Sequence, residues 1–271
     1  MPERILDSPH AGASVPGLSV VLPACNEEAN IGPMIESALE LLPSLADQYE
    51  VIVVDDGSSD ATSTIGEDCV ERHYPAVRLL VHDRNRGYGA AIRTGLQHAE
   101  LDLVFYTDAD RQYDIAELAY FLPYLEHNDL VIGFRVYRYD SVLRSVVSWV
   151  YNRIVGVLFR VRVRDVDCSF KLMRREVTNK LALETDDFFI DTEIVARARK
   201  WNFRIAQKGV RHYPRVAGET NVRASDVWRT LSTIAHMWRR IYLPTRAQRK
   251  EGEAIAGRVI ATEYRPAAAK R

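Results

Sequence analysis

From residue 18 onward the chain alternates between short apolar runs and longer segments in which apolar residues recur every three or four positions. Continuous runs of apolar, largely β-branched residues are typical of strands that are buried on both faces. Such runs predict strands at residues 18–22, 51–54, 77–81, 101–106 and 130–134. The helical spacing predicts intervening helices at residues 29–42, 62–72, 89–99 and 115–125. This alternation predicts an α/β fold with a mostly parallel central sheet and helices on both faces.

Polar side chains follow four successive strands of the predicted sheet. Parallel strands end at one edge of a sheet, and ligands of open α/β sheets bind outside that edge. The clusters are Pro23, Asn26, Glu27 and Glu28, then Asp55, Asp56, Ser58 and Asp60, then Asp83, Arg84 and Arg86, and finally Asp108, Asp110 and Gln112. We therefore expect one binding site along this edge. Asp55-Asp56-Gly57 alone would also suit an ordinary turn.

The tripeptide Asp108-Ala109-Asp110 brings two carboxylates together at the end of a buried strand. The two charges repel each other, and burial of an uncompensated charge is costly. A divalent cation would compensate them, and oxygen ligands suit Mg²⁺ or Mn²⁺. Isolated pairs of this kind are more often solvated loop charges. The neighbouring clusters favour a metal that binds a diphosphate.

Three motifs at this edge resemble those of the family-2 glycosyltransferases, which are inverting enzymes with a nucleotide-diphospho-sugar (GT-A) fold. They are VLPACNEE at 21–28, VVDDGSSD at 53–60 and YTDADRQ at 106–112. The chain most resembles the dolichol- and polyprenyl-phosphate hexosyltransferases, in which Gln follows the DAD tripeptide after one residue, as Gln112 does here. The segment DCSFKL at 167–172 resembles an acceptor-side motif that usually has Gly at the position of Ser169.

This resemblance implies a nucleotide-diphospho-sugar donor, such as UDP-glucose or GDP-mannose, and a Mg²⁺ or Mn²⁺ cofactor. The donor-binding residues that it implies are Pro23, Asn26, Glu27, Asp55, Asp56, Asp108 and Ala109. The metal ligands that it implies are Asp108, Asp110 and Gln112. Arg215 matches a family position near the donor phosphates, so Asp110 and Arg215 are expected to act in catalysis. The dipeptide Ala24-Cys25 departs from the aromatic residue that many members have before Asn.

The segment 134–164 suggests a lipid-phosphate acceptor, because it interleaves arginines with aliphatic and aromatic residues. Such a pattern suits a helix at a membrane surface and recognition of a phosphate. An ordinary amphipathic helix with one core face would show a similar pattern. The resemblance implies the same membrane-facing role for this region. We expect Arg135, Arg144 and Lys171 to contact the acceptor.

The alternative acceptor is an alcohol, which needs a general base to take its proton. Asp191 and Glu193 in FFIDTE at 188–193 are the candidate catalytic bases. Their spacing directs one carboxylate into the site if the segment is extended, whereas the two diverge if it is helical. The sequence leaves both conformations open. A nucleotide-sugar binding protein without turnover is a further alternative.

With 271 residues and a net charge of −1, the chain has no global field that would attract nucleic acid. It shows no secretory signal and no run of about 18 apolar residues, which predicts a cytoplasmic protein, peripheral on the inner face of the membrane. The three cysteines are expected to be reduced. The expected organisation is a flexible N-terminus at 1–16, a catalytic domain at 17–225, an amphipathic helix at 226–245 and a disordered tail at 246–271.

Overall fold

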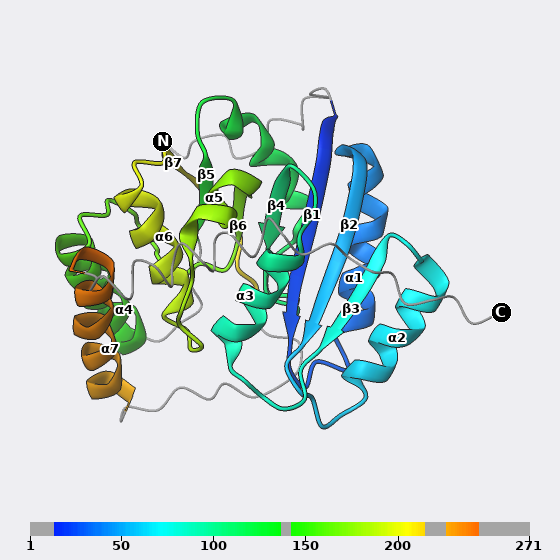
Figure 1. Ribbon diagram of the computed structural model, residues 1–271, viewed down its shortest axis with the longest axis horizontal. Helices are drawn as coiled ribbons and strands as arrows, with labels where there is room; N and C mark the ends of the chain where they lie inside the picture. Colours follow the sequence, from blue (N-terminus) through cyan, green and yellow to red (C-terminus); the bar gives the residue numbers. More distant parts are fainter. Residues whose placement is uncertain (1–13, 137–141, 215–225, 244–271) are drawn as a thin grey trace.

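The computed structural model describes residues 14–136, 142–214 and 226–243, and its centre is a seven-stranded sheet (Figure 1). The strands are β1 (Val15–Ala24), β2 (Ala46–Asp55), β3 (Val77–Val81), β4 (Leu103–Tyr106), β5 (Leu130–Arg135), β6 (Lys171–Arg174) and β7 (Ile205–Val210). Their order in the sheet is β3-β2-β1-β4-β6-β5-β7. Only β6 runs antiparallel to its neighbours, β4 and β5, so the expected mostly parallel α/β sheet is confirmed.

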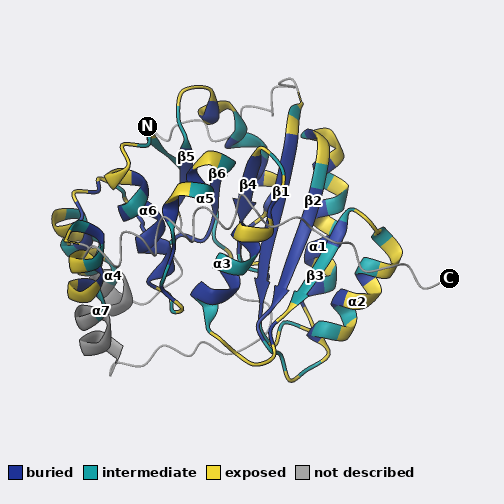
Figure 2. Cartoon of the chain, viewed as in Figure 1, coloured by how far each residue is buried: buried dark blue, intermediate teal, exposed yellow. Residues whose placement is uncertain are grey.

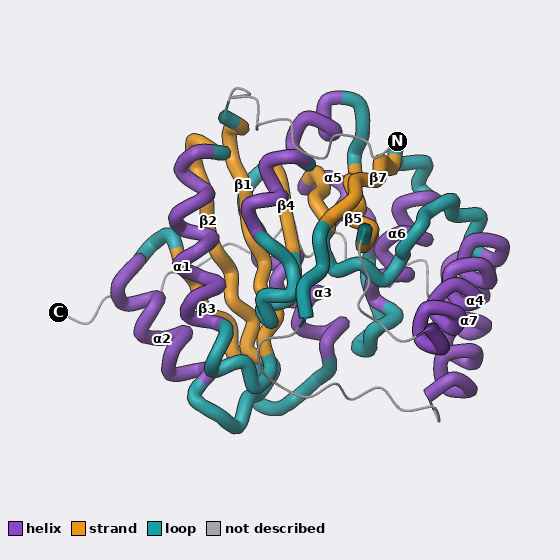
Figure 3. Tube along the Cα trace, turned by 180° about the vertical axis from the view of Figure 1, so that it is seen from behind, coloured by secondary structure: helices purple, strands orange, loops and turns teal. Residues whose placement is uncertain are grey.

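Helices cover both faces of this sheet. They are α1 (Ile31–Leu41), α2 (Thr62–His73), α3 (Tyr88–His98), α4 (Val142–Leu158), α5 (Arg175–Leu181), α6 (Ile190–Lys200) and α7 (Asp226–Tyr242). Val20 of β1 packs in one core cluster with buried residues of α1, whereas Val21 packs in a second cluster with α3, α5, α6 and α7. The central strands are therefore buried on both sides (Figure 2). Figure 3 views the molecule from the side that carries α1 and α2.

The helix that we expected at 115–125 is instead two 3₁₀-helices, η2 (Ile115–Tyr120) and η3 (Leu122–Glu126); a third, η1 (Leu42–Ser44), follows α1. Asp114 caps η2 by accepting a hydrogen bond from Ala116 N at 3.0 Å. Pro123 lies in the first turn of η3. Because proline has no N–H and disfavours the α conformation in the preceding residue, a continuous α-helix through this position is interrupted.

Helices α4 and α7 lie side by side at the end of the molecule farthest from α2 (Figures 1 and 3). The indole N–H of Trp238 in α7 donates to the carbonyl of Leu158 at the end of α4, at 3.0 Å. No helix among the described residues is both long and apolar enough to cross a bilayer. Of the segments that we expected to be flexible or disordered, residues 1–13 and 246–271 lie outside the described residues. The end of the expected flexible N-terminus at 1–16 is instead part of β1, where Val15 N donates to the carbonyl of Leu45 at 2.9 Å.

Candidate active site

The loops that follow β1 and β2 hold each other at the carboxyl edge of the sheet. Asn26 N donates to Ser58 Oγ at 2.9 Å, and Ser59 N donates back to Asn26 Oδ1 at 2.8 Å. Glu27 N donates to Thr62 Oγ1 at 2.8 Å. Asn26 adopts a φ of 56°, a left-handed conformation that asparagine tolerates better than most residues. The structure thus brings together Pro23, Asn26 and Glu27 with the loop that begins at Asp55.

Asp55 and Asp56 lie side by side in sequence but have different surroundings. Asp55 Oδ1 accepts hydrogen bonds from Ser58 N at 3.0 Å and Ser58 Oγ at 2.5 Å. The carboxylate of Asp56 accepts from Arg86 N at 2.9 Å and Gly87 N at 2.8 Å. Asp56 Oδ1 also lies 2.6 Å from Nδ1 of His82. Asp56 is therefore buried and shapes the loop between β3 and α3.

Gly87 and Gly89 bring that loop against a segment near the start of α6. Gly89 N donates to the carbonyl of Asp186 at 2.9 Å. A Cβ on Gly89 would lie 2.5 Å from the carbonyl oxygen of Thr185, and one on Gly87 would lie 2.3 Å from that of Asp186. Only glycine permits this close approach, and the φ of Gly87 is 105°. Tyr88 between them is thereby fixed at the first position of α3.

The two carboxylates of the DAD motif follow β4 directly. Tyr88 donates its hydroxyl to Asp108 Oδ1 at 2.7 Å, and Ser169 Oγ donates to Oδ2 at 2.5 Å. Burial, and then the neighbouring charge of Asp110, raise the pKa of Asp108 to about 7. Asp110 is buried and accepts from Gln112 N at 3.0 Å. Two close, buried carboxylates, of which Asp108 has a raised pKa, form a site that a cation would stabilise.

Gln112 connects the DAD loop to the segment after β7. Its Nε2 donates to the carbonyl of Tyr213 at 3.0 Å, and Tyr213 N donates to the carbonyl of Gln112 at 2.8 Å. His212 forms an isolated β-bridge with Tyr113, and their rings meet edge to face at 5.0 Å. The segment that leads to Arg215 therefore reaches the DAD loop, although Arg215 itself lies outside the described residues.

The donor set at this edge fits Mg²⁺ or Mn²⁺. Asp108, Asp110 and the side-chain carbonyl of Gln112 could supply oxygen ligands from one loop. Among the described residues no group of three or more His, Cys, Asp or Glu could hold a metal by itself. Mg²⁺ is commonly bound by only one or two carboxylates together with substrate phosphates. The residues present therefore suit a metal that binds jointly with a diphosphate.

Lys171, which we expected to bind the acceptor, is fully buried. Its ammonium group donates to Asp191 Oδ1 and, at 2.6 Å, to the carbonyl of Cys168. The hydroxyl of Tyr106 donates to the same oxygen of Asp191 at 2.7 Å. The structure therefore places Lys171 in an internal ion pair with one of the two expected bases.

Glu193, the other expected base, is also fully buried. It lies with Asp191 in the first turn of α6, so the segment is helical and the two carboxylates diverge. Glu193 accepts hydrogen bonds from Glu184 N at 3.1 Å, Thr185 N at 2.9 Å and Arg197 Nε at 2.6 Å. These contacts show that Glu193 anchors the loop before α6.

The two expected acceptor arginines lie on different elements. Arg135 at the end of β5 forms a bidentate ion pair with Asp165, with Nε–Oδ2 at 2.6 Å and Nη2–Oδ1 at 2.8 Å. Its side chain remains 18% exposed. Arg144 belongs to α4, in a part of the helix whose side chains are not described.

Three further residues were not among the expected site residues: Tyr88 and Ser169, which donate to Asp108, and Asp167, which lies in the same motif as Ser169. Burial, and then the charges of Asp191 and Asp165, raise the pKa of Asp167 to about 7. Its carboxylate accepts a long hydrogen bond of 3.5 Å from Thr192 Oγ1. Both Asp167 and Ser169 lie in the DCSFKL motif, and the departure of Ser169 from the usual glycine was an available signal. Tyr88 had no such signal, because its role depends on tertiary packing.

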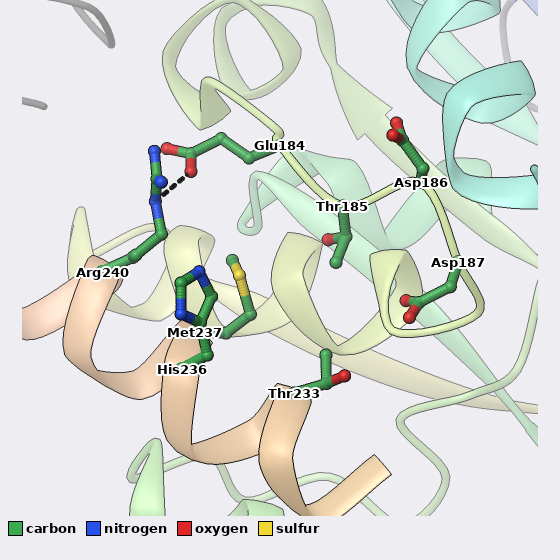
Figure 4. A pocket seen from close by; sticks show the side chains of 8 residues that line it. All are labelled: Glu184, Thr185, Asp186, Asp187, Thr233, His236, Met237 and Arg240. Atoms are coloured by element: carbon green, nitrogen blue, oxygen red, sulfur yellow. Dashed lines mark ion pairs between the residues drawn. The ribbon is translucent and has the colours of Figure 1, made fainter. Parts of the chain in front are cut away.

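A pocket of about 540 Å³ lies between α7 and the loop that Glu193 anchors (Figure 4). Its lining includes Asp187, Thr233 and Met237. Arg240 Nε and Glu184 Oε2 form an ion pair of 2.5 Å at its edge. Asp108 and Asp110 do not line this pocket, but the loop that borders it also packs against Gly87 and Gly89. The pocket is therefore adjacent to the candidate site.

Known proteins resemble this chain in both sequence and fold. The sequence profile described as glycosyl transferase family 2 matches residues 19–182. Dodecaprenyl-phosphate galacturonate synthase from Rhizobium johnstonii is 31% identical over 217 residues, which cover 79% of this chain and 64% of that protein. Dolichyl-phosphate beta-glucosyltransferase from Dictyostelium discoideum is 30% identical over 213 residues, which cover 71% and 65%. The chain thus spans slightly less than two thirds of these relatives.

A solved structure of glucosyl-3-phosphoglycerate synthase from Mycobacterium tuberculosis, in complex with Mn²⁺, uridine diphosphate and glucosyl-3-phosphoglycerate, shares the fold with a TM-score of 0.60. It is 22% identical, and the alignment covers 85% of this chain and 82% of that one. The profile match covers more than half of the chain and includes the DAD motif. The chain belongs to glycosyl transferase family 2 and has the GT-A fold.

Proposed function

We propose that this glycosyltransferase moves a hexose, with inversion, from a nucleotide-diphospho-sugar to a polyprenyl phosphate. The observation that carries the proposal is the convergence of Asp108, Asp110 and Gln112 with the segment at 212–213, at the edge where the β1 and β2 loops also meet. Two relatives are named as a dodecaprenyl-phosphate galacturonate synthase and a dolichyl-phosphate beta-glucosyltransferase. These names support a lipid-phosphate acceptor for this chain.

The donor would lie across the carboxyl edge of the sheet. Pro23, Asn26, Glu27 and Asp55 would line the nucleoside pocket, and Ala109 would allow close approach beside the diphosphate. Asp56 would contribute indirectly, by holding the 82–87 loop in place beside the donor, because its carboxylate already binds that loop. The proposed donor is a nucleotide-diphospho-sugar of the UDP-glucose or GDP-mannose type.

Asp108, Asp110 and Gln112 would hold Mg²⁺ or Mn²⁺ at the diphosphate. When bound, the metal supplies positive charge that stabilises the leaving diphosphate. The reaction breaks the bond between the anomeric carbon and the diphosphate oxygen, through an oxocarbenium-like transition state. The acceptor oxygen forms its bond from the opposite face of the sugar, which inverts the anomeric carbon. Arg215 is proposed to stabilise the same leaving group.

The surroundings of Asp191 and Glu193 favour a phosphate acceptor. An alcohol would need a free carboxylate to accept its proton. Asp191 is paired with Lys171 in the interior, and Glu193 is buried against the backbone of the 184–185 loop. A phosphate monoester is already an anion at neutral pH, so it needs positioning and no general base. Arg135 would take part in that positioning, and Arg144 is retained as a second candidate.

Exposed apolar side chains on α4 support contact with a membrane. Trp149 and Val157 are 68% and 69% exposed, and Arg153 between them is also exposed. Positions 149, 153 and 157 are each four residues apart and therefore share one face of the helix. Arginine beside exposed aromatic and aliphatic residues suits an anionic lipid surface. We propose that this face of α4 rests on the membrane that contains the acceptor.

A second candidate function is transfer to an alcohol, and the observation that favours it is Asp167. Its half-buried carboxylate has a pKa raised to about 7 and lies in the acceptor-side motif. A group with such a pKa suits general-base catalysis near neutral pH. This role would make Asp167, and neither Asp191 nor Glu193, the proton acceptor.

A panel of acceptors separates the two functions. Purified protein with Mn²⁺ and either UDP-glucose or GDP-mannose would be offered a short polyprenyl phosphate, the matching polyprenol and soluble sugars. Transfer to the phosphate alone, retained in Asp167→Asn, supports the first function. Transfer to polyprenol or to a sugar, lost in Asp167→Asn, supports the second and overturns the first.

A further inference from the structure

The carboxylate of Asp108 is held from both sides by hydroxyl groups that come from distant parts of the chain. Tyr88 at the start of α3 donates to Oδ1 at 2.7 Å. Ser169, in the loop before β6, donates to Oδ2 at 2.5 Å. Both distances lie in the range of ordinary or short O–H···O hydrogen bonds to an anion. Rotation of the Asp108 side chain would break at least one of them.

We infer that Tyr88 and Ser169 are positioning residues that fix the orientation of Asp108 for metal and diphosphate binding. This inference rests on the proposed metal-dependent function of the site. An ionised carboxylate has about four lone-pair directions. Two of them accept from Tyr88 and Ser169, so acceptor capacity remains on each oxygen of Asp108. The two hydroxyl groups therefore restrict the carboxylate without exhausting its capacity for a cation.

Tyr88 is itself rigidly placed, which a positioning residue requires. Gly87 and Gly89 press its backbone against the carbonyl groups of Asp186 and Thr185. Its ring stacks on Phe188, with centroids 5.2 Å apart and an interplanar angle of 29°. Neither contact involves the hydroxyl group. Substitution of Tyr88 by phenylalanine should therefore leave the packing intact and remove only the hydrogen bond to Asp108.

Ser169 offers an equally selective substitution. The side chain is buried, and its hydroxyl group donates a hydrogen bond to Asp108. The glycine that usually occupies this position in the family motif could not make that hydrogen bond. Substitution by alanine keeps the Cβ and removes the donor. The hydroxyl of Ser169 thus gives this chain a second donor to Asp108 that a glycine could not supply.

The decisive measurement is Mn²⁺ affinity of the full-length protein, read from the electron paramagnetic resonance signal of free Mn²⁺ with UDP or GDP present. Partners that orient a metal ligand typically contribute about 10- to 100-fold in affinity. We expect Tyr88→Phe and Ser169→Ala each to weaken Mn²⁺ binding by about 10-fold or more. The double variant should lose less than the product of the two effects, because both groups hold one carboxylate.

Thermal unfolding distinguishes positioning from a purely structural role. Without metal, the two variants should melt within a few degrees of the parent, whereas the rise in melting temperature on adding Mn²⁺ and nucleotide should be smaller. Tyr242→Phe is the matched control, because the Tyr242 hydroxyl donates to the Phe159 carbonyl at 2.8 Å, and it should bind Mn²⁺ as the parent does.

The outcomes separate this inference from the proposed function. Parent-like Mn²⁺ affinity in both variants, while Asp110→Asn has lost binding, would overturn the inference and leave the proposed function standing. A parent protein that binds no Mn²⁺ with either nucleotide would overturn both. If a variant melts early without metal and its Mn²⁺-induced stabilisation equals that of the parent, the hydroxyl group is structural and the inference is wrong.

Discussion

Lys171 and Asp191 form an ion pair in the interior, where their side chains are 0% and 4% exposed. Tyr106 donates its hydroxyl to the same carboxylate oxygen that receives the Lys171 ammonium group. The sequence suggested Lys171 as an acceptor contact and Asp191 as a catalytic base. The pair instead joins β6 to the start of α6, and Asp191 is close enough to Asp108 for its charge to contribute to the raised pKa of that carboxyl.

Removing one member of this pair should destabilise the fold strongly. We expect Lys171→Met to lower the free energy of unfolding by about 3–5 kcal/mol, because it leaves a buried charge without a partner. Urea unfolding monitored by circular dichroism measures this change. The double variant Lys171→Met with Asp191→Leu should recover part of the loss. Arg72→Ala at the exposed pair with Glu36 is the control and should cost about 0–1 kcal/mol. A loss for Lys171→Met as small as that control would contradict the account.

Glu193 should prove structural and not act as the base. Glu193→Gln weakens charge-assisted hydrogen bonds to Arg197 and to the 184–185 backbone, each worth about 1.5–3 kcal/mol. We expect lower stability in thermal or urea unfolding and retention of most transfer activity at a temperature where the variant is folded. Full stability with abolished transfer would identify Glu193 as the base and contradict our assignment.

The raised pKa of Asp167 should appear as a pH dependence of stability. Its pKa is about 7 in the folded protein and near 3.8 in the unfolded chain, so the folded state binds this proton more tightly than the unfolded state does. Ionisation therefore lowers the free energy of unfolding as the pH rises from about 4 to about 7. Asp167→Asn removes this penalty and should gain stability relative to the parent over that range, by up to about 4 kcal/mol at pH 8. Urea unfolding at pH 5 and pH 8 measures the difference, and a gain that does not grow with pH would contradict it.

The outer face of α4 should contribute to membrane binding. Val157→Ser and Trp149→Ser should each reduce co-sedimentation with anionic phospholipid vesicles several-fold, because buried apolar area is lost from the bound state. Both side chains are mostly exposed, so thermal stability should hardly change. Val81→Ser is the matched control, since Val81 is 54% exposed on β3 at the opposite edge of the sheet. Equal losses in Val157→Ser and Val81→Ser would argue against this surface.

The sequence was most informative where local pattern and tertiary structure coincide. Val20 and Val21 in β1 pack against helices on opposite faces of the sheet. Because both faces are buried, the sequence of this strand is a continuous apolar run. The alternation of such runs with helical spacing was sufficient for the fold and for the edge that holds Asp55 and Asp108. The segment at 115–125 has helical spacing as well, but Pro123 interrupts it.

The sequence was least informative about charged residues whose partners lie far along the chain. Lys171 was predicted as an acceptor contact because it lies in the motif that resembles an acceptor-side motif. Its burial depends on Asp191, which lies in another element. Glu193 was predicted as a base from its place in the segment FFIDTE, and its backbone partners in the 184–185 loop leave no sequence signature. Tyr88 meets Asp108 only after α3 has packed on the sheet, so no local motif could indicate that contact.

The most direct test of the central claim is metal-dependent transfer of labelled hexose to a short polyprenyl phosphate, with lipid product measured for the parent and Asp110→Asn. UDP-glucose and GDP-mannose would be compared with Mn²⁺ or Mg²⁺ and with EDTA. We predict that one donor gives lipid-linked sugar only with metal, and that Asp110→Asn lowers the rate by at least about 100-fold, consistent with loss of a metal ligand. Lipid product formed equally well in EDTA, or by Asp110→Asn, would contradict the account.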